Sequence, residues 1–355
     1  MSFSAADREY MVRALRLAAQ GMNTTTPNPR VGCVLVKDGA VVGEGWHERA
    51  GEAHAEVHAL RNAGDAARGA TAYVTLEPCS HHGRTPPCAD ALVAAGVARV
   101  IAAMRDPNPQ VAGEGLARLT QSGIEVECGL MEDDARNLNI GFVSRMTRGR
   151  PWVRLKVAAS LDGKTALMNG VSQWITGTEA RRHAHAWRAR SCAIMTGSGT
   201  VVDDDPSLTV RDVPCTRQPL RVVVDGDLKT PPTAKVLADH GALIYTSRSG
   251  RLSGAETVTL PAEAGKVDLL GVMTDLGRRG INELMVEGGA RLNGALIKAD
   301  LVDELLIYQA PVLLGDIARG MFDLPELESL GEARRLVVHE RRALGSDIFL
   351  RARFA

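Results

Sequence analysis

A chain of 355 residues is long for a single domain, so its length predicts two domains. Hydrophobic residues make up 45% and charged residues 24%, which is ordinary for a globular protein with a packed core. The 42 basic residues equal the 42 acidic ones, and only 4% of residues are aromatic, which argues against nucleic acid as a partner.

Membrane and secretory features are also missing from the sequence. No apolar run approaches the ~18 residues that cross a bilayer, and residues 1–8 lack the apolar core of a signal peptide. Six cysteines in a chain of this size are not a disulfide framework. We therefore expect a cytoplasmic protein that binds neither membrane nor nucleic acid.

The chain begins with a predicted helix, a stiff loop and a hairpin. Residues 5–20 place apolar side chains at helical spacing, and Gly21 follows as a stop signal. The loop 24–30 is stiff because it holds two prolines; it is either a connector or a substrate loop in which Asn28 offers both a donor and an acceptor. Residues 31–36 and 40–45 flank a Lys-Asp-Gly turn, which predicts a hairpin.

The rest of the first half alternates between predicted helices and strands. This alternation is typical of an α/β unit, and we expect its sheet to be mostly parallel. The predicted helices are 54–63, 86–95, 114–121 and 132–146, and the predicted strands are 71–76, 99–103 and 124–127.

One histidine and two cysteines in this half form a candidate zinc site. His54, Cys79 and Cys88 would supply three ligands and leave a fourth position open, as catalytic zinc sites do. A water at that position becomes a nucleophile near neutral pH, and Glu56 is the natural proton carrier. Cys88 begins a predicted helix, where thiolates form more easily. The pattern resembles the signature of zinc-dependent nucleobase deaminases.

The histidines and cysteines of this chain also allow other interpretations. His58 has the spacing of the second histidine in zinc proteases, but the glutamate is at the wrong position for that motif. His81 and His82 lie between the cysteines and could be ligands, although a position facing solvent or substrate is favoured. A structural zinc would normally take four protein ligands and would not need Glu56. The remaining cysteines show no metal spacing and are read as core or incidental residues: Cys33, Cys128, Cys192 and Cys215.

A basic, polar stretch at 145–151 that ends in Gly-Arg-Pro predicts a domain boundary. We divide the chain into domains 1–147 and 151–355. The second domain opens with a predicted strand at 152–160 and a turn at 161–165. A predicted helix at 178–189 is flanked or occupied by four arginines, which form either a solvated face or, with Arg211, a phosphate site: Arg181, Arg182, Arg188 and Arg190.

Glycine-rich turns follow two further predicted strands. Residues 197–200 come after the strand 193–196 and read as a flexible loop with backbone amides available to an anion. The aspartates 203–205 would point in different directions, which disfavours a shared metal ion. Residues 283–294 read as a strand, a glycine turn and a helix start, an arrangement that holds phosphates. The other predicted elements are a helix at 267–279 and strands at 221–224, 242–245, 305–310, 334–339 and 346–354.

Two sets of motifs in this sequence resemble one family, the bifunctional riboflavin-biosynthesis deaminase/reductase. The first half carries Pro-Asn-Pro-Arg-Val-Gly at 27–32, His-Ala-Glu at 54–56, Glu-Pro-Cys at 77–79 and Gly-Arg-Thr-Pro-Pro-Cys at 83–88. The second half carries Ser-Leu-Asp-Gly-Lys at 160–164, Ser-Gln-Trp-Ile-Thr at 172–176, Asp-Asp-Pro-Ser-Leu-Thr at 204–209 and Glu-Gly-Gly at 287–289. The eight residues between Cys79 and Cys88 also argue against a cytidine or tRNA-adenosine deaminase, in which this gap is short.

The resemblance implies an N-terminal cytidine-deaminase-like α/β/α sandwich and a C-terminal dihydrofolate-reductase-like α/β domain. It implies Zn²⁺ and NADPH as cofactors, a pyrimidine ribosyl phosphate as substrate, and a homodimer or larger assembly. Deamination of a diaminopyrimidinone would be followed by reduction of its ribosyl group to ribityl.

The resemblance also assigns site residues. The implied dinucleotide contacts are Ala158, Trp174, Thr200, Asp204, Gly289, Ala290, Arg291, Leu292, Asn293 and Gly294. The implied substrate contacts are Ser172, Arg188, Leu208, Arg211 and Glu287, with the two arginines at the phosphate.

Two alternatives stay open at this point. One is a zinc deaminase of nucleosides or nucleic-acid bases with a fused binding domain, which the neutral charge and scarce aromatics disfavour. The other is a partner-binding subunit with a structural zinc. Replacing Glu56 with alanine would separate the second alternative from a deaminase, because only a deaminase would lose ammonia release while keeping its zinc.

Overall fold

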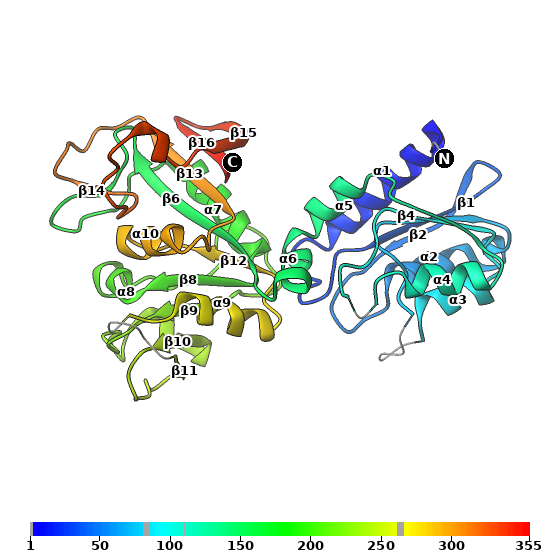
Figure 1. The fold of residues 1–355 in the computed structure, drawn as a ribbon, viewed down its shortest axis with the longest axis horizontal. Coiled ribbons are helices and arrows are strands. Elements are labelled where there is room, and N and C mark those ends of the chain that lie inside the picture. The colour runs from blue at the N-terminus through cyan, green and yellow to red at the C-terminus, as the bar shows by residue number, and fades with distance from the viewer. Residues whose placement is uncertain (1–2, 81–85, 110, 261–265) are drawn as a thin grey trace. The chain divides into compact units, whose positions relative to one another are not determined.

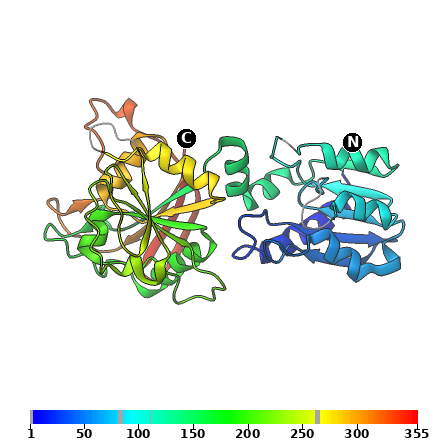
Figure 2. The ribbon, with the colours of Figure 1, turned by 90° about the horizontal axis from the view of Figure 1, so that it is seen from below.

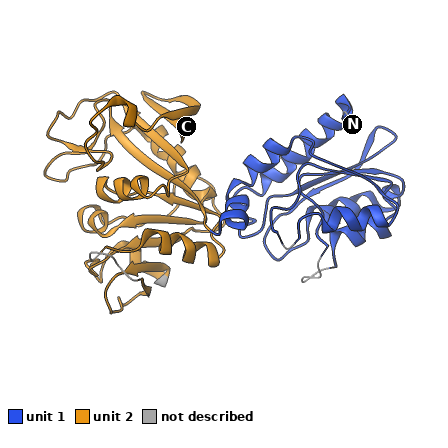
Figure 3. Cartoon of the chain, in the orientation of Figure 1, with its two compact units in different colours: residues 1–149 blue, residues 150–355 orange. Residues whose placement is uncertain are grey.

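The computed structural model describes residues 3–80, 86–109, 111–260 and 266–355. The chain forms two compact units, residues 1–149 and 150–355 (Figure 3). Within the described ranges, no helix combines the length and the apolar character that crossing a membrane requires.

The first unit is a five-stranded sheet covered by helices on both faces, an α/β/α sandwich. In Figure 1, α1 and α5 run along one side of this sheet, and α2, α3 and α4 run along the other. Its elements are α1 (Ala5–Gln20), β1 (Gly32–Lys37), β2 (Ala40–Trp46), α2 (Ala55–Ala63), the 3₁₀ helix η1 (Gly64–Ala67), β3 (Thr71–Val74), α3 (Cys88–Ala94), β4 (Arg99–Ala102), α4 (Glu114–Gln121), β5 (Glu125–Cys128), α5 (Glu132–Leu138) and α6 (Ile140–Arg148).

The sheet of the first unit has the strand order β2-β1-β3-β4-β5. β1 is antiparallel to β2 and to β3, whereas β3 is parallel to β4 and β4 to β5. The prediction of a mostly parallel sheet is therefore wrong, because the Lys-Asp-Gly hairpin adds two antiparallel pairings. Fully buried strand residues such as Val34 and Ile101 form the centre of this unit's core.

The predicted helix 132–146 is also wrong, because it divides at Asn139. The Asn139 side chain donates to the Arg30 carbonyl oxygen at 2.9 Å and accepts from the Arg30 amide at 2.8 Å. This side chain is buried and its backbone leaves the helical region (φ −107°, ψ 22°). A polar contact with a residue 109 positions away thus ends α5 and restarts the chain as α6.

The second unit is built on a nine-stranded sheet, whose strands fan out with the usual twist in Figure 2. Its elements are β6 (Trp152–Ser160), β7 (Lys164–Ala166), α7 (Thr178–Arg190), β8 (Ala193–Gly197), α8 (Ser198–Asp204), β9 (Leu220–Val224), η2 (Lys235–His240), β10 (Ala242–Thr246), β11 (Ala255–Thr259), α9 (Leu269–Arg278), β12 (Glu283–Val286), α10 (Ala290–Lys298), β13 (Glu304–Ala310), β14 (Arg319–Gly320), η3 (Leu330–Glu332), β15 (Leu336–Leu344) and β16 (Asp347–Phe354).

The large sheet has the strand order β11-β10-β9-β8-β12-β6-β13-β16-β15. Strands β11 to β13 in this order are parallel, and β16 and β15 continue the sheet in antiparallel pairing. The carboxyl ends of the parallel strands therefore meet along one edge. The chain leaves β6 toward β8 on one side and later returns past β6 to β13 on the other, and such reversals are where open α/β sheets bind ligands.

The glycine-rich segment 197–200 differs from its prediction as a flexible loop. Gly197 is extended (φ −102°, ψ 157°) and Ser198 begins α8. The predicted strand 334–339 also differs in its bounds, since β15 starts at Leu336 and continues to Leu344. The fold class itself is confirmed: two α/β units, each a sheet with helices packed against it.

A buried charge network ties the central strands of the second unit together. The Arg154 guanidinium donates from Nε to Glu304 at 2.7 Å and also contacts Glu283. These three side chains are almost inaccessible to water, with exposed fractions of 3% or less. Burying a charge costs free energy unless the charge is paired and hydrogen-bonded. Further arginines pair with Glu283 and Glu304: Arg190, Arg351 and Arg353.

Candidate functional site

The first unit brings together the three predicted metal ligands. The His54 Nδ1 atom lies 3.3 Å from the Cys88 sulfur and 3.6 Å from the Cys79 sulfur. All three ligand atoms lie within 4.8 Å of one another, and no other histidine, cysteine or carboxylate of the described residues joins this group. One nitrogen and two sulfurs are donors that zinc prefers, and a three-residue set leaves room for a fourth, exchangeable ligand.

Helix starts position these ligands. His54 is the N-cap of α2, and Cys88 is the first residue of α3. The Cys88 backbone amide donates to the Cys79 sulfur at 3.3 Å. Hydrogen bonds from Cys88 and His54 lower the pKa of Cys79, whereas Cys79 and burial raise the pKa of Cys88. One negative charge is thus concentrated on Cys79 and shared with its neighbours, which suits a cation.

Glu56 follows His54 in the first turn of α2 and is 3% exposed. Burial raises the pKa of this carboxyl to about 7, and the Cys79 charge acts in the same direction. A buried carboxyl with a pKa near neutrality can both take up and release a proton, which is the property required of a general acid–base group.

A buried histidine orients the predicted substrate residue Asn28. The His47 Nδ1 atom lies 3.1 Å from the Ala53 carbonyl oxygen, so Nδ1 must carry the proton. The other nitrogen, Nε2, then accepts from the Asn28 Nδ2 group at 3.0 Å. Asn28 is therefore held with its amide oxygen available as an acceptor. The His47 ring also packs edge-on against the ligand His54.

Glu77 supports the segment that carries Cys79, a role that we did not predict. Its carboxylate accepts from the backbone amides of Asp106 (3.0 Å), Gly113 (3.0 Å) and Gly115 (2.9 Å). The backbone packs closely at the same place, since a Cβ atom on Gly115 would lie 1.9 Å from the Pro78 carbonyl oxygen. A glutamate immediately before Pro-Cys was the sequence signal for this support.

The alternative ligands do not join the metal group. His58 lies one turn further along α2 and is outside the cluster of His54, Cys79 and Cys88. His81 and His82 fall outside the described residues. Cys33 and Cys192 are buried and Cys128 and Cys215 half-buried, and none of the four belongs to the cluster.

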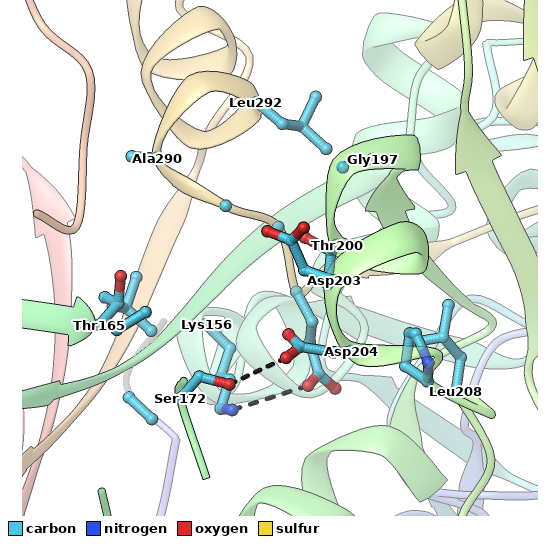
Figure 4. A pocket seen from close by; sticks show the side chains of 18 of the residues that line it. Lys156, Thr165, Ser172, Gly197, Thr200, Asp203, Asp204, Leu208, Ala290 and Leu292 are labelled. Carbon is cyan, nitrogen blue, oxygen red and sulfur yellow. Dashed lines mark hydrogen bonds and ion pairs between the residues drawn. The ribbon is translucent and has the colours of Figure 1, made fainter. Parts of the chain in front are cut away.

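The second unit contains a cavity of about 1670 Å³ at the carboxyl edge of its parallel strands. Its walls come from β6, from α7 and α8, and from the glycine turn between β12 and α10 (Figure 4). Typical small-molecule pockets measure roughly 300–1,000 Å³, so this cavity has room for two ligands side by side. The volume and the glycine turn fit a dinucleotide together with a second, smaller molecule.

Most of the predicted reductase residues line this cavity. All five predicted substrate residues in this unit do so: Ser172, Arg188, Leu208, Arg211 and Glu287. Eight of the ten predicted dinucleotide residues do so as well: Ala158, Trp174, Thr200, Asp204, Gly289, Ala290, Arg291 and Leu292.

Asn293 and Gly294 are placed differently from the other predicted dinucleotide residues. Asn293 is buried and donates to the Met321 carbonyl oxygen at 3.2 Å. A Cβ atom on Gly294 would lie 2.0 Å from the Asp323 carbonyl oxygen. Among the described residues of this turn, these two therefore hold the segment 321–323 against α10 and are absent from the cavity lining.

A carboxylate clamped between two cations lies in the cavity wall. Arg188 donates to Glu287 from Nε (2.5 Å) and Nη2 (2.9 Å), and the Lys156 ammonium lies 3.6 Å from the same carboxylate. Burial raises the pKa of Glu287, but Arg188 and Lys156 outweigh burial and lower it to about 2. Glu287 is thus an ionised acceptor facing the cavity. Lys156 was missed because nothing in a strand sequence tells which lysine faces a cavity.

The four arginines in and next to α7 lie in four different environments. Arg188 pairs with Glu287, and Arg190 pairs with Glu283 at 2.7 Å. The Arg181 guanidinium stacks over the Trp174 ring, 4.6 Å from its centre. Arg182 is exposed and does not line the cavity. The helix is therefore neither a solvated basic face nor a convergent phosphate site.

The three consecutive aspartates diverge, as expected from their spacing. Asp203 pairs with Arg319 at 2.8 Å, and Asp204 accepts from the Ser172 hydroxyl at 2.9 Å. Asp205 pairs with Lys235 at 3.3 Å. Each carboxylate thus fastens a different segment around the cavity.

Comparisons with known proteins agree with both sites. The family model for the cytidine and deoxycytidylate deaminase zinc-binding region matches residues 4–104, and the model for the RibD C-terminal domain matches residues 151–350. The riboflavin biosynthesis protein RibD of Escherichia coli (strain K12) is 52% identical, over 97% of this chain and 98% of its own. The Aquifex aeolicus RibD is 41% identical over 97% of each chain.

Solved structures extend the similarity to the whole chain. Acinetobacter baumannii RibD (form 1) superposes with a TM-score of 0.94 at 44% identity, covering 99% of both chains. A diaminohydroxyphosphoribosylaminopyrimidine deaminase/5-amino-6-(5-phosphoribosylamino)uracil reductase from Thermotoga maritima gives a TM-score of 0.90 at 32% identity, also over 99% of both chains. The chain belongs to the RibD family, the bifunctional deaminase–reductases of riboflavin biosynthesis.

Proposed function

We propose that residues 1–147 deaminate 2,5-diamino-6-(5-phosphoribosylamino)pyrimidin-4-one, and that residues 151–355 reduce the resulting ribosylaminouracil with NADPH. One observation carries this proposal: a three-residue zinc set with a buried carboxylate and a two-ligand cavity at a strand-end edge occur in one chain. The names of the similar proteins support the substrate class. We further propose a homodimer or larger assembly in the cytoplasm.

In the deaminase unit, His54, Cys79 and Cys88 would hold the zinc ion. Zinc, when bound at such a site, lowers the pKa of water enough to make it a nucleophile near neutral pH. Glu56 takes a proton from the attacking water and gives one to the departing amine, so that water replaces ammonia at the amidine carbon. Asn28, fixed by His47, offers its amide oxygen to an N–H group of the pyrimidine.

In the reductase unit, the chain positions two ligands against each other. NADPH, when bound, would supply the hydride that the ribosyl carbon carrying the amine takes up. The backbone amides at the start of α10, after Gly288 and Gly289, would hold phosphate groups of the dinucleotide. Glu287 accepts a hydrogen bond from the pyrimidine, Arg188 and Lys156 keep its carboxylate ionised, and Arg211 binds the ribosyl phosphate. The bond between that ribosyl carbon and the ring oxygen breaks as the new C–H bond forms, and the ring oxygen takes one proton from water to become a hydroxyl group.

The test follows NADPH absorbance in the presence of the diaminopyrimidinone substrate. We expect oxidation with the intact enzyme, loss of oxidation after zinc is stripped, and recovery when the deaminated pyrimidine is supplied instead. This pattern would establish both activities and their order. Absence of oxidation with either pyrimidine would refute the reductase assignment, and continued oxidation of the diamino compound without zinc would refute the deaminase assignment.

A further inference from the structure

The segment 208–211, which carries the predicted contacts Leu208 and Arg211, is fastened to α7 by two side chains of that helix. The Arg188 Nη1 group donates to the Thr209 carbonyl oxygen at 2.8 Å. The His185 Nδ1 atom accepts from the Arg211 backbone amide at 3.0 Å. On its other side, the segment is held by Gln218, which accepts from the Val210 amide at 2.7 Å.

The contact with Arg211 fixes the chemical state of His185. A backbone amide can only donate, so Nδ1 must be unprotonated and the proton must reside on Nε2, which faces the Asp212 carboxylate at 3.8 Å. His185 is 7% exposed. Burial, Arg188 and Arg211 lower the pKa of His185 to about 4, although Asp212 and Glu287 act in the opposite direction. The ring is therefore a neutral acceptor at physiological pH.

The backbone of this segment requires external support. Leu208 and Asp212 adopt left-handed conformations, with φ of 50° and 61°, and Leu208 is buried. Such conformations are unfavourable for residues other than glycine and persist where the surrounding structure determines them. Hydrogen bonds hold the backbone at three successive residues, 209 to 211. Their partners are the side chains of Arg188, Gln218 and His185.

The two arginines predicted at the phosphate are not equivalent. The Nε, Nη1 and Nη2 atoms of Arg188 are all engaged, with Glu287 and with the Thr209 carbonyl oxygen. Arg211 lines the cavity and is exposed, and among the described residues its guanidinium donates only to the neutral Thr209 hydroxyl, at 3.0 Å. In the part of the chain that the structure describes, no carboxylate pairs with the Arg211 guanidinium. Of these two arginines, Arg211 is therefore the one whose positive charge is left for a phosphate ester.

We propose that His185 is a positioning residue of the reductase, which holds the Arg211 backbone so that the Arg211 guanidinium meets the phosphate of the pyrimidine substrate. The inference rests on the proposed reductase function and makes that function more specific. It assigns the phosphate contact to Arg211 with His185 behind it, while Arg188 organises the carboxylate Glu287 and the same segment.

The experiment compares His185→Ala, His185→Gln, Arg211→Ala and the double variant His185→Ala/Arg211→Ala in the full chain. Each is assayed with the deaminated ribosylaminouracil with and without its phosphate. Loss of one hydrogen bond changes affinity by about 2- to 10-fold, so we expect KM for the phosphorylated substrate to rise by that factor in His185→Ala. KM for NADPH, kcat, and the deaminase activity of the same chain should stay unchanged. His185→Gln should recover most of the affinity, because its amide oxygen can accept the Arg211 amide.

Two comparisons decide the matter. If His185 acts through Arg211, the double variant loses no more than Arg211→Ala, and His185→Ala has no effect on the dephosphorylated substrate. Additive losses, or equal losses with and without the phosphate, would overturn the inference. Arg182→Ala is the matched control, because Arg182 lies exposed on the same helix outside the cavity lining.

Calorimetric titration of the same variants with the phosphorylated pyrimidine separates this inference from the proposed function. Wild-type binding that is weakened by His185→Ala, without NADPH oxidation, would support the positioning role and refute the reductase reaction. Suppose instead that the wild type oxidises NADPH, and that His185→Ala binds the pyrimidine with the wild-type affinity and KM. This result would support the reductase reaction and refute the positioning role of His185.

Discussion

The two sites of this chain are assembled in opposite ways. The proposed zinc ligands and Glu56 come from residues 54–88 and lie close together, two of the ligands at the starts of helices. The reductase cavity takes its walls from residues 156–323 and from five or more elements along one sheet edge. The first site would place its chemistry at one metal ion, whereas the second would recognise its ligands through many separate contacts.

Charge follows the same division. In the first unit, anionic character gathers on Cys79 and leaves a place for a cation. In the second unit, the Glu287 carboxylate is already neutralised by Arg188 and Lys156, which are part of the chain itself. The first site is thus completed by its cofactor, and the second is largely preorganised before a ligand arrives. Single substitutions should therefore abolish the first activity and only weaken the second.

The largest effect is expected for Cys88→Ala. Removal of one of three protein ligands should prevent stable zinc binding, so that deaminase activity falls below detection. The reductase activity of the same chain should persist with the already deaminated substrate. Zinc content by mass spectrometry and the two activities provide the measurement. A variant that keeps both zinc and deamination would show that Cys88 is no ligand.

Glu56→Gln tests whether proton transfer in the first site depends on this one carboxyl group. The glutamine has nearly the same shape but cannot exchange a proton, and general acid–base groups contribute about 10²- to 10⁴-fold. We expect a fall in deaminase kcat of that size with normal zinc content. A fall in zinc content in parallel would mean instead that Glu56 supports the metal. Glu52→Gln, at an exposed residue before the helix, is the control.

Arg154→Met tests how much the buried charge network stabilises the second unit, residues 150–355. Removing one member of a buried ion-pair network costs about 3–5 kcal/mol, because Glu283 and Glu304 would lose a partner with almost no access to water. Urea unfolding followed through reductase activity should shift to lower urea, while the loss of deaminase activity should not shift. Arg334→Ala serves as the control, since its partner Asp300 is 80% exposed. Equal shifts for both variants would contradict a special role for burial.

The same contrast explains what could be predicted from the sequence. The hairpin was predictable because Asp38 and Gly39 are adjacent and suit the left-handed turn that they adopt (φ 50° and 76°). His54 and Glu56 were predictable as a pair because one helix turn places them together. Features of this kind can be predicted because they depend only on residues that are close together in the sequence.

Contacts between distant residues were not predictable in the same way. The resemblance assigned Arg188 to a phosphate, but its pairing with Glu287, 99 residues further along the chain, was not foreseen. Asn139 looked like one more residue of a helix until the fold placed Arg30 beside it. The cavity itself was foreseen only through motifs, because no local pattern shows which strand residues face the same edge. Family resemblance therefore supplied the reductase residues, whereas the zinc site followed from ligand chemistry together with the deaminase signature that the residues match.

The smallest effect is expected for Arg319→Ala, which removes the ion pair between β14 and Asp203 of α8. Both side chains are more than 40% exposed, and exposed ion pairs contribute about 0.2–1 kcal/mol. Unfolding stability should therefore change little, and KM for NADPH should change by less than about fivefold, a limit that follows from the same energy. Steady-state kinetics at low and high salt provide the measurement, because screening should abolish the difference from wild type. A salt-independent loss of more than 10²-fold would show that Arg319 binds a ligand directly, and the cavity would then depend on one point as strongly as the zinc site does.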